Sequence, residues 1–167
     1  MFKVGQLIVY GNRGIYRVDK VGIPEIEWLK PQTEYYTLLP VFKEDKIYIP
    51  VDTSVYMRPV MSKDEMIGLM KGLYAPNGFD TAESRNPRSQ EAIYKSEIES
   101  HDVKRILGLI GVLWEKRRSF DQKGKRLSQI DEKYLTIAEN IFYEEVAVVF
   151  DVTLDEAPDI VKRVILE

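Results

Sequence analysis

Residues 2–18 read Phe2-Lys3-Val4-Gly5-Gln6-Leu7-Ile8-Val9-Tyr10-Gly11-Asn12-Arg13-Gly14-Ile15-Tyr16-Arg17-Val18. The apolar run from Leu7 to Tyr10 predicts a short strand that is buried on both faces. The segment 11–14 predicts a turn, because glycine and asparagine accept positive φ angles at low cost. A second strand is expected to start near Tyr16. This stretch therefore begins a β domain.

Two further β-rich runs follow, at 35–41 and 46–51, joined by a hairpin at 42–45. The second run alternates, so Ile47, Ile49 and Val51 are expected to share one face. Four or five short strands with a turn roughly every ten residues are typical of a small closed barrel. We therefore predict a β-barrel over residues 1–60, a type of domain that more often docks a partner than catalyses a reaction.

The remaining residues, 61–167, are predicted to form an all-helical domain of four to five helices, which makes the fold class α+β. Ser62 and Glu65 have the spacing of a capping box that starts a helix. This helix and a loop over 79–90 are expected to form a hinge region, 61–90. A short helix is predicted over 91–100, and longer ones are expected after the caps Asp102 and Ser128, with a last helix after Val152.

The composition is that of a globular protein without a membrane span or a disulfide framework. The chain has 167 residues, 44% hydrophobic and 31% charged, and no cysteine. No apolar run is long enough to cross a bilayer, and the first residues enter a strand at once, so no signal peptide is expected. We predict a cytoplasmic protein that does not bind a membrane.

A basic block lies inside this acidic chain, whose net charge is −3. Residues 103–127 hold eight basic and two acidic residues, whereas residues 128–167 hold three basic and ten acidic ones. Such a block suggests contact with a polyanion, although charge alone favours the simpler interpretation of a solvated helix end and loop. Its basic residues are Lys104, Arg105, Lys116, Arg117, Arg118, Lys123, Lys125 and Arg126.

The sequence offers no constellation for catalysis. His101 is the only histidine and stands in a cap-like Ser-His-Asp tripeptide. The segment 11–14 lacks the Lys-Ser/Thr and the following helix of a phosphate loop. Paired carboxylates are sequence neighbours, which point to different sides of a helix. We predict no enzyme activity, no cofactor, no metal and no small-molecule substrate.

Several motifs resemble those of CarD/CdnL-type bacterial transcription regulators. The likeness covers Phe2-Lys3-Val4-Gly5, Val9-Tyr10, Gly14-Ile15, Val18, Tyr35-Tyr36-Thr37-Leu38 and Ile49-Pro50-Val51, and it continues through His101-Asp102-Val103, Leu113-Trp114 and Glu145-Val146-Ala147. It spans nearly the whole chain, whereas transcription-repair coupling factors share only the barrel. The N-terminal motif is the more specific part.

The resemblance implies a Tudor/SH3-like barrel that docks on the β subunit of RNA polymerase, partly through a strand edge. It also implies a helical domain that contacts promoter DNA at the upstream edge of the melted region and thereby modulates open-complex stability. In that family a Trp enters the minor groove beside basic residues on phosphates. Unstacking a base step costs a few kcal/mol, and phosphate contacts offset this cost.

The chain departs from this family pattern at two positions. Pro87 stands where the family has its wedge Trp, and Tyr48 stands where polymerase-binding members often carry Arg. By resemblance and charge, the expected DNA contacts are Arg85, Pro87, Arg88, Lys116, Arg117, Arg118, Lys123, Lys125 and Arg126. The expected polymerase contacts are Lys46 and Tyr48, although Tyr48 also fits an ordinary outward strand residue.

Two other functions stay open at this point. One is an adaptor that docks on polymerase without wedging DNA. The other is a KOW-like RNA or ribosome binder, against which the acidic residues of the barrel argue. The docking hypothesis assumes a closed N-terminal sheet whose free margin is not covered by the chain's own helices.

Overall fold

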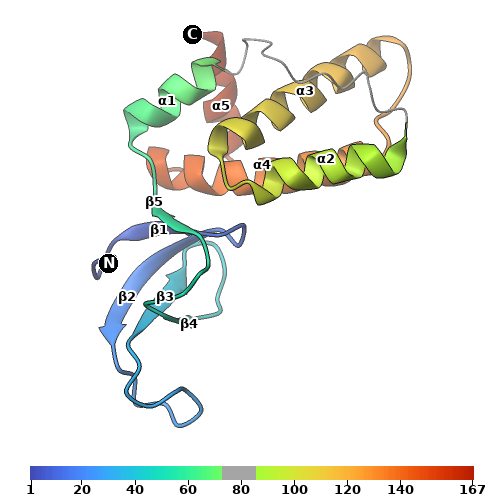
Figure 1. Ribbon diagram of the computed structural model, residues 1–167. Helices are drawn as coiled ribbons and strands as arrows, with labels where there is room; N and C mark the ends of the chain where they lie inside the picture. Colours follow the sequence, from blue (N-terminus) through green and yellow to red (C-terminus); the bar gives the residue numbers. More distant parts are fainter. Residues whose placement is uncertain (73–85) are drawn as a thin grey trace. The chain divides into compact units, whose positions relative to one another are not determined.

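The computed structural model describes residues 1–72 and 86–167. The chain divides into two compact units, Met1–Val60 and Met61–Glu167. Among these described residues, the first unit holds five strands and the second five helices (Figure 1), so the predicted α+β class is confirmed. Within the described ranges, no helix combines the length and the apolar character needed to cross a membrane.

The first unit is a single antiparallel sheet with the strand order β4-β3-β2-β1-β5. The sheet is open, with β4 and β5 as its two edges, so the predicted closure is wrong. Both edge strands are short and both end in proline, whose missing N–H cannot extend a hydrogen-bonded ladder. The strands are β1 (Leu7–Tyr10), β2 (Ile15–Gly22), β3 (Tyr35–Pro40), β4 (Ile47–Pro50) and β5 (Met57–Pro59).

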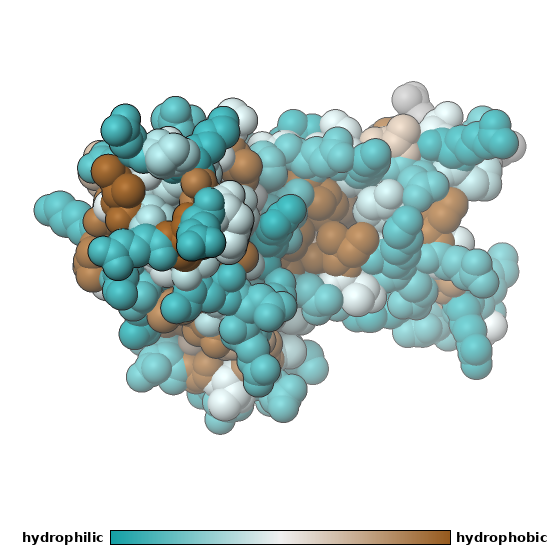
Figure 2. Space-filling model, turned by 90° about the horizontal axis from the view of Figure 1, so that it is seen from below, coloured by the Kyte–Doolittle hydropathy of each residue, from teal (hydrophilic) through white to brown (hydrophobic). Residues whose placement is uncertain are grey.

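One face of this sheet carries the core of the unit. Its fully covered members are Ile8, Tyr10, Tyr16, Val18, Tyr36 and Leu38. Ile47, Ile49 and Val51 pack against them, as their alternation predicted. The turn at 11–14 is also confirmed, because the N–H of Tyr10 donates to the Gly14 carbonyl at 3.0 Å. On the face shown in Figure 2, hydrophobic surface occurs in patches bordered by hydrophilic side chains.

The second unit contains five helices whose starts are largely set by side-chain caps. Glu65 accepts from the N–H of Ser62 at 2.9 Å, which completes the predicted capping box. Asp102 and Ser128 cap the third and fourth helices, also as predicted. The helices are α1 (Lys63–Gly72), α2 (Pro87–Glu99), α3 (Val103–Gln122), α4 (Gln129–Phe150) and α5 (Ala157–Leu166).

Helix α2 begins earlier than the sequence pattern indicated. The segment 87–90 was expected to be loop, but Pro87 is the first residue of α2. The side chain of Asn86 accepts from the N–H of Arg88 at 3.0 Å and so caps the helix. Proline suits the first turn of a helix, because its φ angle is already helical and its N–H would have no partner there. A proline that was interpreted as a loop residue therefore starts a helix.

Candidate functional site

The β4 edge has main-chain groups that point away from the sheet. The N–H of Val51 donates to the Glu34 carbonyl at 3.0 Å, and β4 continues the register as Tyr36↔Ile49 and Leu38↔Ile47. Hydrogen-bonded and non-bonded pairs alternate in an antiparallel ladder. Because Glu34 and Val51 form a hydrogen-bonded pair, the pair Thr37↔Tyr48, three positions along the ladder, is a non-hydrogen-bonded pair. Consequently the N–H and C=O of Tyr48 face outward, in the direction from which a further strand would add.

The other edge, β5, offers much less to a partner strand. The Gly11 N–H donates to the Tyr56 carbonyl at 2.8 Å, and that of Val60 donates to the Leu7 carbonyl at 3.3 Å. By the same alternation, Met57 and Pro59 are the β5 residues whose main chain faces outward. Pro59 has no N–H, and its carbonyl accepts from Arg58 Nη1 at 3.1 Å. Proline and charge are usual means of blocking an edge strand.

Both predicted polymerase contacts lie at the β4 edge. Lys46 is exposed immediately before the strand, and Tyr48 is partly covered within it. The indole of Trp28, which is 75% exposed, lies edge-on to the Tyr48 ring, with ring centroids 6.1 Å apart. No role was predicted for Trp28. Its contact with Tyr48 could not be deduced from the sequence, because the two residues are twenty positions apart in the chain.

A buried polar network joins three helices of the second unit. Asp131, in the first turn of α4, is 0% exposed. Its Oδ1 accepts from the Tyr94 hydroxyl of α2 at 2.7 Å, and its Oδ2 lies 2.7 Å from Lys116 Nζ of α3. Gln90 Nε2 donates to the same Tyr94 hydroxyl at 2.8 Å. The N-termini of α2 and α4 and the C-terminal part of α3 thus lie at one end of the unit (Figure 1).

This network shifts the ionisation of Tyr94. Burial, and then the hydrogen bond and charge of Asp131, raise the pKa of the Tyr94 hydroxyl well above its ordinary value. Farther along α4, burial and then the Glu139 carboxylate raise the pKa of Tyr143 to about 12. Both hydroxyls therefore stay neutral at physiological pH, and Tyr94 acts as a hydrogen-bond donor to the buried carboxylate.

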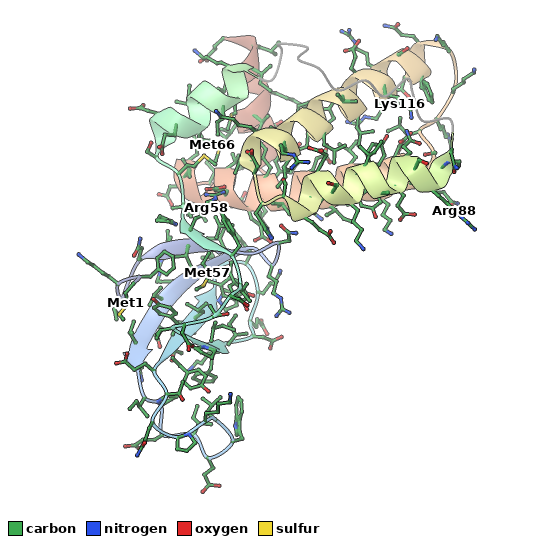
Figure 3. The ribbon with its side chains drawn as sticks, in the orientation of Figure 1. Met1, Met57, Arg58, Met66, Arg88 and Lys116 are labelled. Atoms are coloured by element: carbon green, nitrogen blue, oxygen red, sulfur yellow. The ribbon has the colours of Figure 1, made fainter. Side chains whose placement is uncertain are left out.

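The predicted basic residues fall into two groups at this end. Lys116 is held by Asp131, and Arg118 Nη2 lies 2.7 Å from Glu115 Oε1. These two cations already have acidic partners. Figure 3 shows Lys116 on α3, and Arg88 at the start of α2 with its side chain directed outward. Arg118 is nevertheless exposed. The other described residues of the predicted set, Pro87, Arg88, Arg117, Lys123, Lys125 and Arg126, are exposed as well, and Arg85 lies outside the described residues.

Three of the exposed basic residues, Lys123, Lys125 and Arg126, lie in the connection between α3 and α4. Lys123 to Arg126 form the connection between α3 and α4, and Gly124 allows the tight bend with φ of 68°. The N–H of Lys125 donates back to the Phe120 carbonyl at 2.8 Å, which fixes the turn. Helix N-termini carry partial positive charge, and two of them begin beside these side chains. The arrangement therefore favours a polyanion over a cation.

Trp114 does not take the place of the missing family wedge. Its Nε1 donates to Glu139 Oε1 at 2.6 Å, which bonds α3 to α4. Its side chain is partly covered. The role of Asp131 was missed, because Asp131 and Glu132 are one of the pairs of neighbouring carboxylates to which no site was assigned. Asp131 is buried because α2 and α3 pack against it. The residues next to Asp131 in the sequence give no sign of this packing.

The structure thus has an open sheet with a free β4 edge and, after it in the chain, a helical unit with exposed basic residues. Residues 2–61 match the family model of the CarD-like/TRCF RID domain. The N-terminal unit therefore belongs to this family of RNA-polymerase-interacting domains. A comparison of the chain with curated proteins gave no match.

Proposed function

We propose that this protein is a CarD-like transcription regulator that docks on the β subunit of RNA polymerase through its β4 edge and contacts promoter DNA through the basic end of its helical unit. The match of residues 2–61 to the RID family carries the proposal. The bound protein then modulates the stability of the open complex. Such activity belongs in the compartment where transcription takes place.

The docking mode follows from the edge geometry. Strand addition derives affinity from main-chain hydrogen bonds and specificity from alternate side chains. The β4 edge presents the N–H and C=O of Tyr48, while Pro59 limits the β5 edge. The open sheet contradicts the closed sheet that the docking hypothesis assumed, so the proposal now depends on the β4 edge and on the family match. Pairing needs an unpaired strand edge, which an open sheet has and a fully closed barrel lacks.

The DNA part of the proposal is based on the basic end of the helical unit. Arg88, Arg117, Lys123, Lys125 and Arg126 are exposed cations beside two helix N-termini. Phosphate contacts of this kind position a protein on a duplex and make its binding salt-dependent. Arg85 and Pro87 complete the proposed contact, Pro87 as an apolar residue at the groove.

The docking proposal can be tested with two substitutions at one residue. Tyr48→Pro removes an outward N–H without removing a hydrogen bond to β3, because the Thr37↔Tyr48 pair is non-bonded. Tyr48→Ala keeps that N–H but loses the ring. We expect the full-length Tyr48→Pro variant to bind core RNA polymerase at least tenfold more weakly than Tyr48→Ala. Wild-type protein that fails to bind polymerase would refute the proposal itself.

The DNA proposal can be tested by charge reversal, with a control variant of the same net charge. Lys125→Glu with Arg126→Glu should shorten or lengthen open-complex lifetime relative to wild type and lower the salt dependence of the effect. Lys162→Glu with Arg163→Glu is the matched control, because both residues are exposed on α5. Equal lifetimes for the two double variants would remove the turn at 123–126 from the DNA contact.

One observation favours an adaptor as a second candidate. The position of the family wedge is occupied by Pro87, whose place as the first residue of α2 already gives it a structural role. An adaptor would dock on polymerase and leave the open complex unchanged. Polymerase binding that is retained in the Lys125→Glu, Arg126→Glu variant, together with wild-type protein that has no promoter effect, would establish this alternative.

A further inference from the structure

The β4 edge carries an aromatic pair that the docking role by itself does not require. Trp28 is 75% exposed, although burying an indole is strongly favourable. It lies edge-on to Tyr48, at 6.1 Å between centroids and an interplanar angle of 81°. The ring planes are thus fixed relative to each other, and the indole stays open to a partner.

The loop that carries Trp28 is held in place by the sheet. The N–H of Leu29 donates to the Ile26 carbonyl at 3.1 Å and closes a turn around the tryptophan. The following N–H, of Lys30, donates to the Tyr35 hydroxyl at 3.3 Å, and Tyr35 is buried at the start of β3. Trp28 is therefore presented from an anchored turn, which lowers the entropy lost on binding.

The aromatic pair lies on the outer face of the docking edge. Ile47 and Ile49 pack into the core, so Tyr48, between them, points to the opposite face. A residue of an added strand directly opposite Tyr48 would have its Cβ about 5 Å from the Tyr48 Cβ. The side chain of that residue would reach the exposed indole.

The net negative charge of the loop that carries Trp28 indicates which kind of partner side chain would bind there. The loop 23–34 contains Glu25, Glu27 and Glu34 against Lys30. Glu25 and Glu27 are exposed and lie within three residues of Trp28 in the chain. The face of an indole attracts Arg or Lys electrostatically, and carboxylates in the same loop favour the same cation. An acidic or apolar partner residue would gain less here.

We infer that Trp28 and Tyr48, with Glu25 and Glu27, form a receptor for one arginine or lysine side chain on the polymerase strand that pairs with β4. The inference rests on the proposed docking function and adds the chemistry by which this chain selects its partner. The main-chain hydrogen bonds set the alignment of the polymerase strand with β4, and the aromatic pair binds one side chain of that strand.

A substitution series at Trp28 in the full-length protein tests this receptor. We measure the dissociation constant for core RNA polymerase and expect Trp28→Ala to weaken it roughly 3- to 30-fold, the range of cation–π contacts. Trp28→Phe should retain most of the affinity, because it keeps a π face. Trp28→Leu should lose as much as alanine, whereas a purely hydrophobic contact would make leucine nearly neutral and would overturn the inference.

Two controls separate this receptor from general damage and from the docking proposal. Tyr56→Ala removes a 42% exposed aromatic residue beside the β5 edge and should leave the dissociation constant within twofold of wild type. Glu25→Gln with Glu27→Gln should weaken binding, whereas Asp155→Asn with Glu167→Gln should not. Wild-type binding with all Trp28 variants unaffected would refute the receptor and leave docking intact. Wild-type protein that does not bind would refute both.

Discussion

The Tyr94 hydroxyl lies 2.7 Å from Oδ1 of Asp131, which bonds the middle of α2 to the first turn of α4. Asp131 also bonds to its own helix cap, since its N–H donates to Ser128 Oγ at 3.1 Å. The main chain of Asp131 is therefore bonded to the helix start, and its carboxylate joins α4 to Tyr94 of α2 and Lys116 of α3. Because it holds the basic end of the helical unit together, several consequences for stability can be measured.

Asp131→Asn should destabilise the protein strongly. Removing one partner of a buried ion pair leaves the other charge uncompensated, at a typical cost of 3–5 kcal/mol. Lys116 is 22% exposed and so keeps some hydration, which lowers the expected loss to about 2–3 kcal/mol. Urea unfolding measures the change. Asp121→Asn, at an exposed position, is the control and should change stability by less than about 0.5 kcal/mol.

Tyr94 should make the protein less stable at alkaline pH. The folded pKa of its hydroxyl is raised above the ordinary value of 10.0, so the unfolded chain loses this proton first as the pH rises. The stabilisation is fully present below pH 10 and declines above it by up to about 1.4 kcal/mol per pH unit. Urea midpoints between pH 9 and 11 should fall less steeply for Tyr94→Phe than for wild type. Parallel slopes would contradict the assignment.

Ser62→Ala should weaken the start of α1. The Ser62 hydroxyl accepts from the N–H of Glu65 at 3.3 Å and is bonded to the Glu65 side chain at 2.9 Å. Loss of such a cap typically costs about 1 kcal/mol. Ser96→Ala, at an exposed position inside α2, controls for the better helix propensity of alanine. An equal unfolding free energy for the two variants would show that the cap contributes nothing.

Leu38→Ala should be among the most harmful single changes in the β unit. Leu38 is 0% exposed and belongs to the core cluster, so its truncation removes buried surface and leaves a cavity. Such changes cost about 2–5 kcal/mol. Leu39→Ala is the matched control, because the next residue of β3 points to the opposite face and is only partly buried. The two variants should differ by more than 1 kcal/mol in urea unfolding, as expected from their burial.

Local patterns in the sequence correctly predicted most of the elements. The apolar run 7–10, the alternation around Ile49 and the capping residues Ser62, Asp102 and Ser128 act over a few residues, so their effect is visible in the chain itself. The same kind of pattern misled at Pro87. A proline after Asn fits both a loop and a helix start, and the bond from the Arg88 N–H to Asn86 decides between them.

The sequence by itself determined the β and helical halves, the faces of the strands and the helix caps, because these depend on contacts between near neighbours. Only the tertiary structure decided that the sheet stays open, that Asp131 is buried with Lys116 and Tyr94, and that Trp28 stands exposed against Tyr48. Each of these depends on residues that are far apart in the chain, and their proximity is set by how whole elements pack.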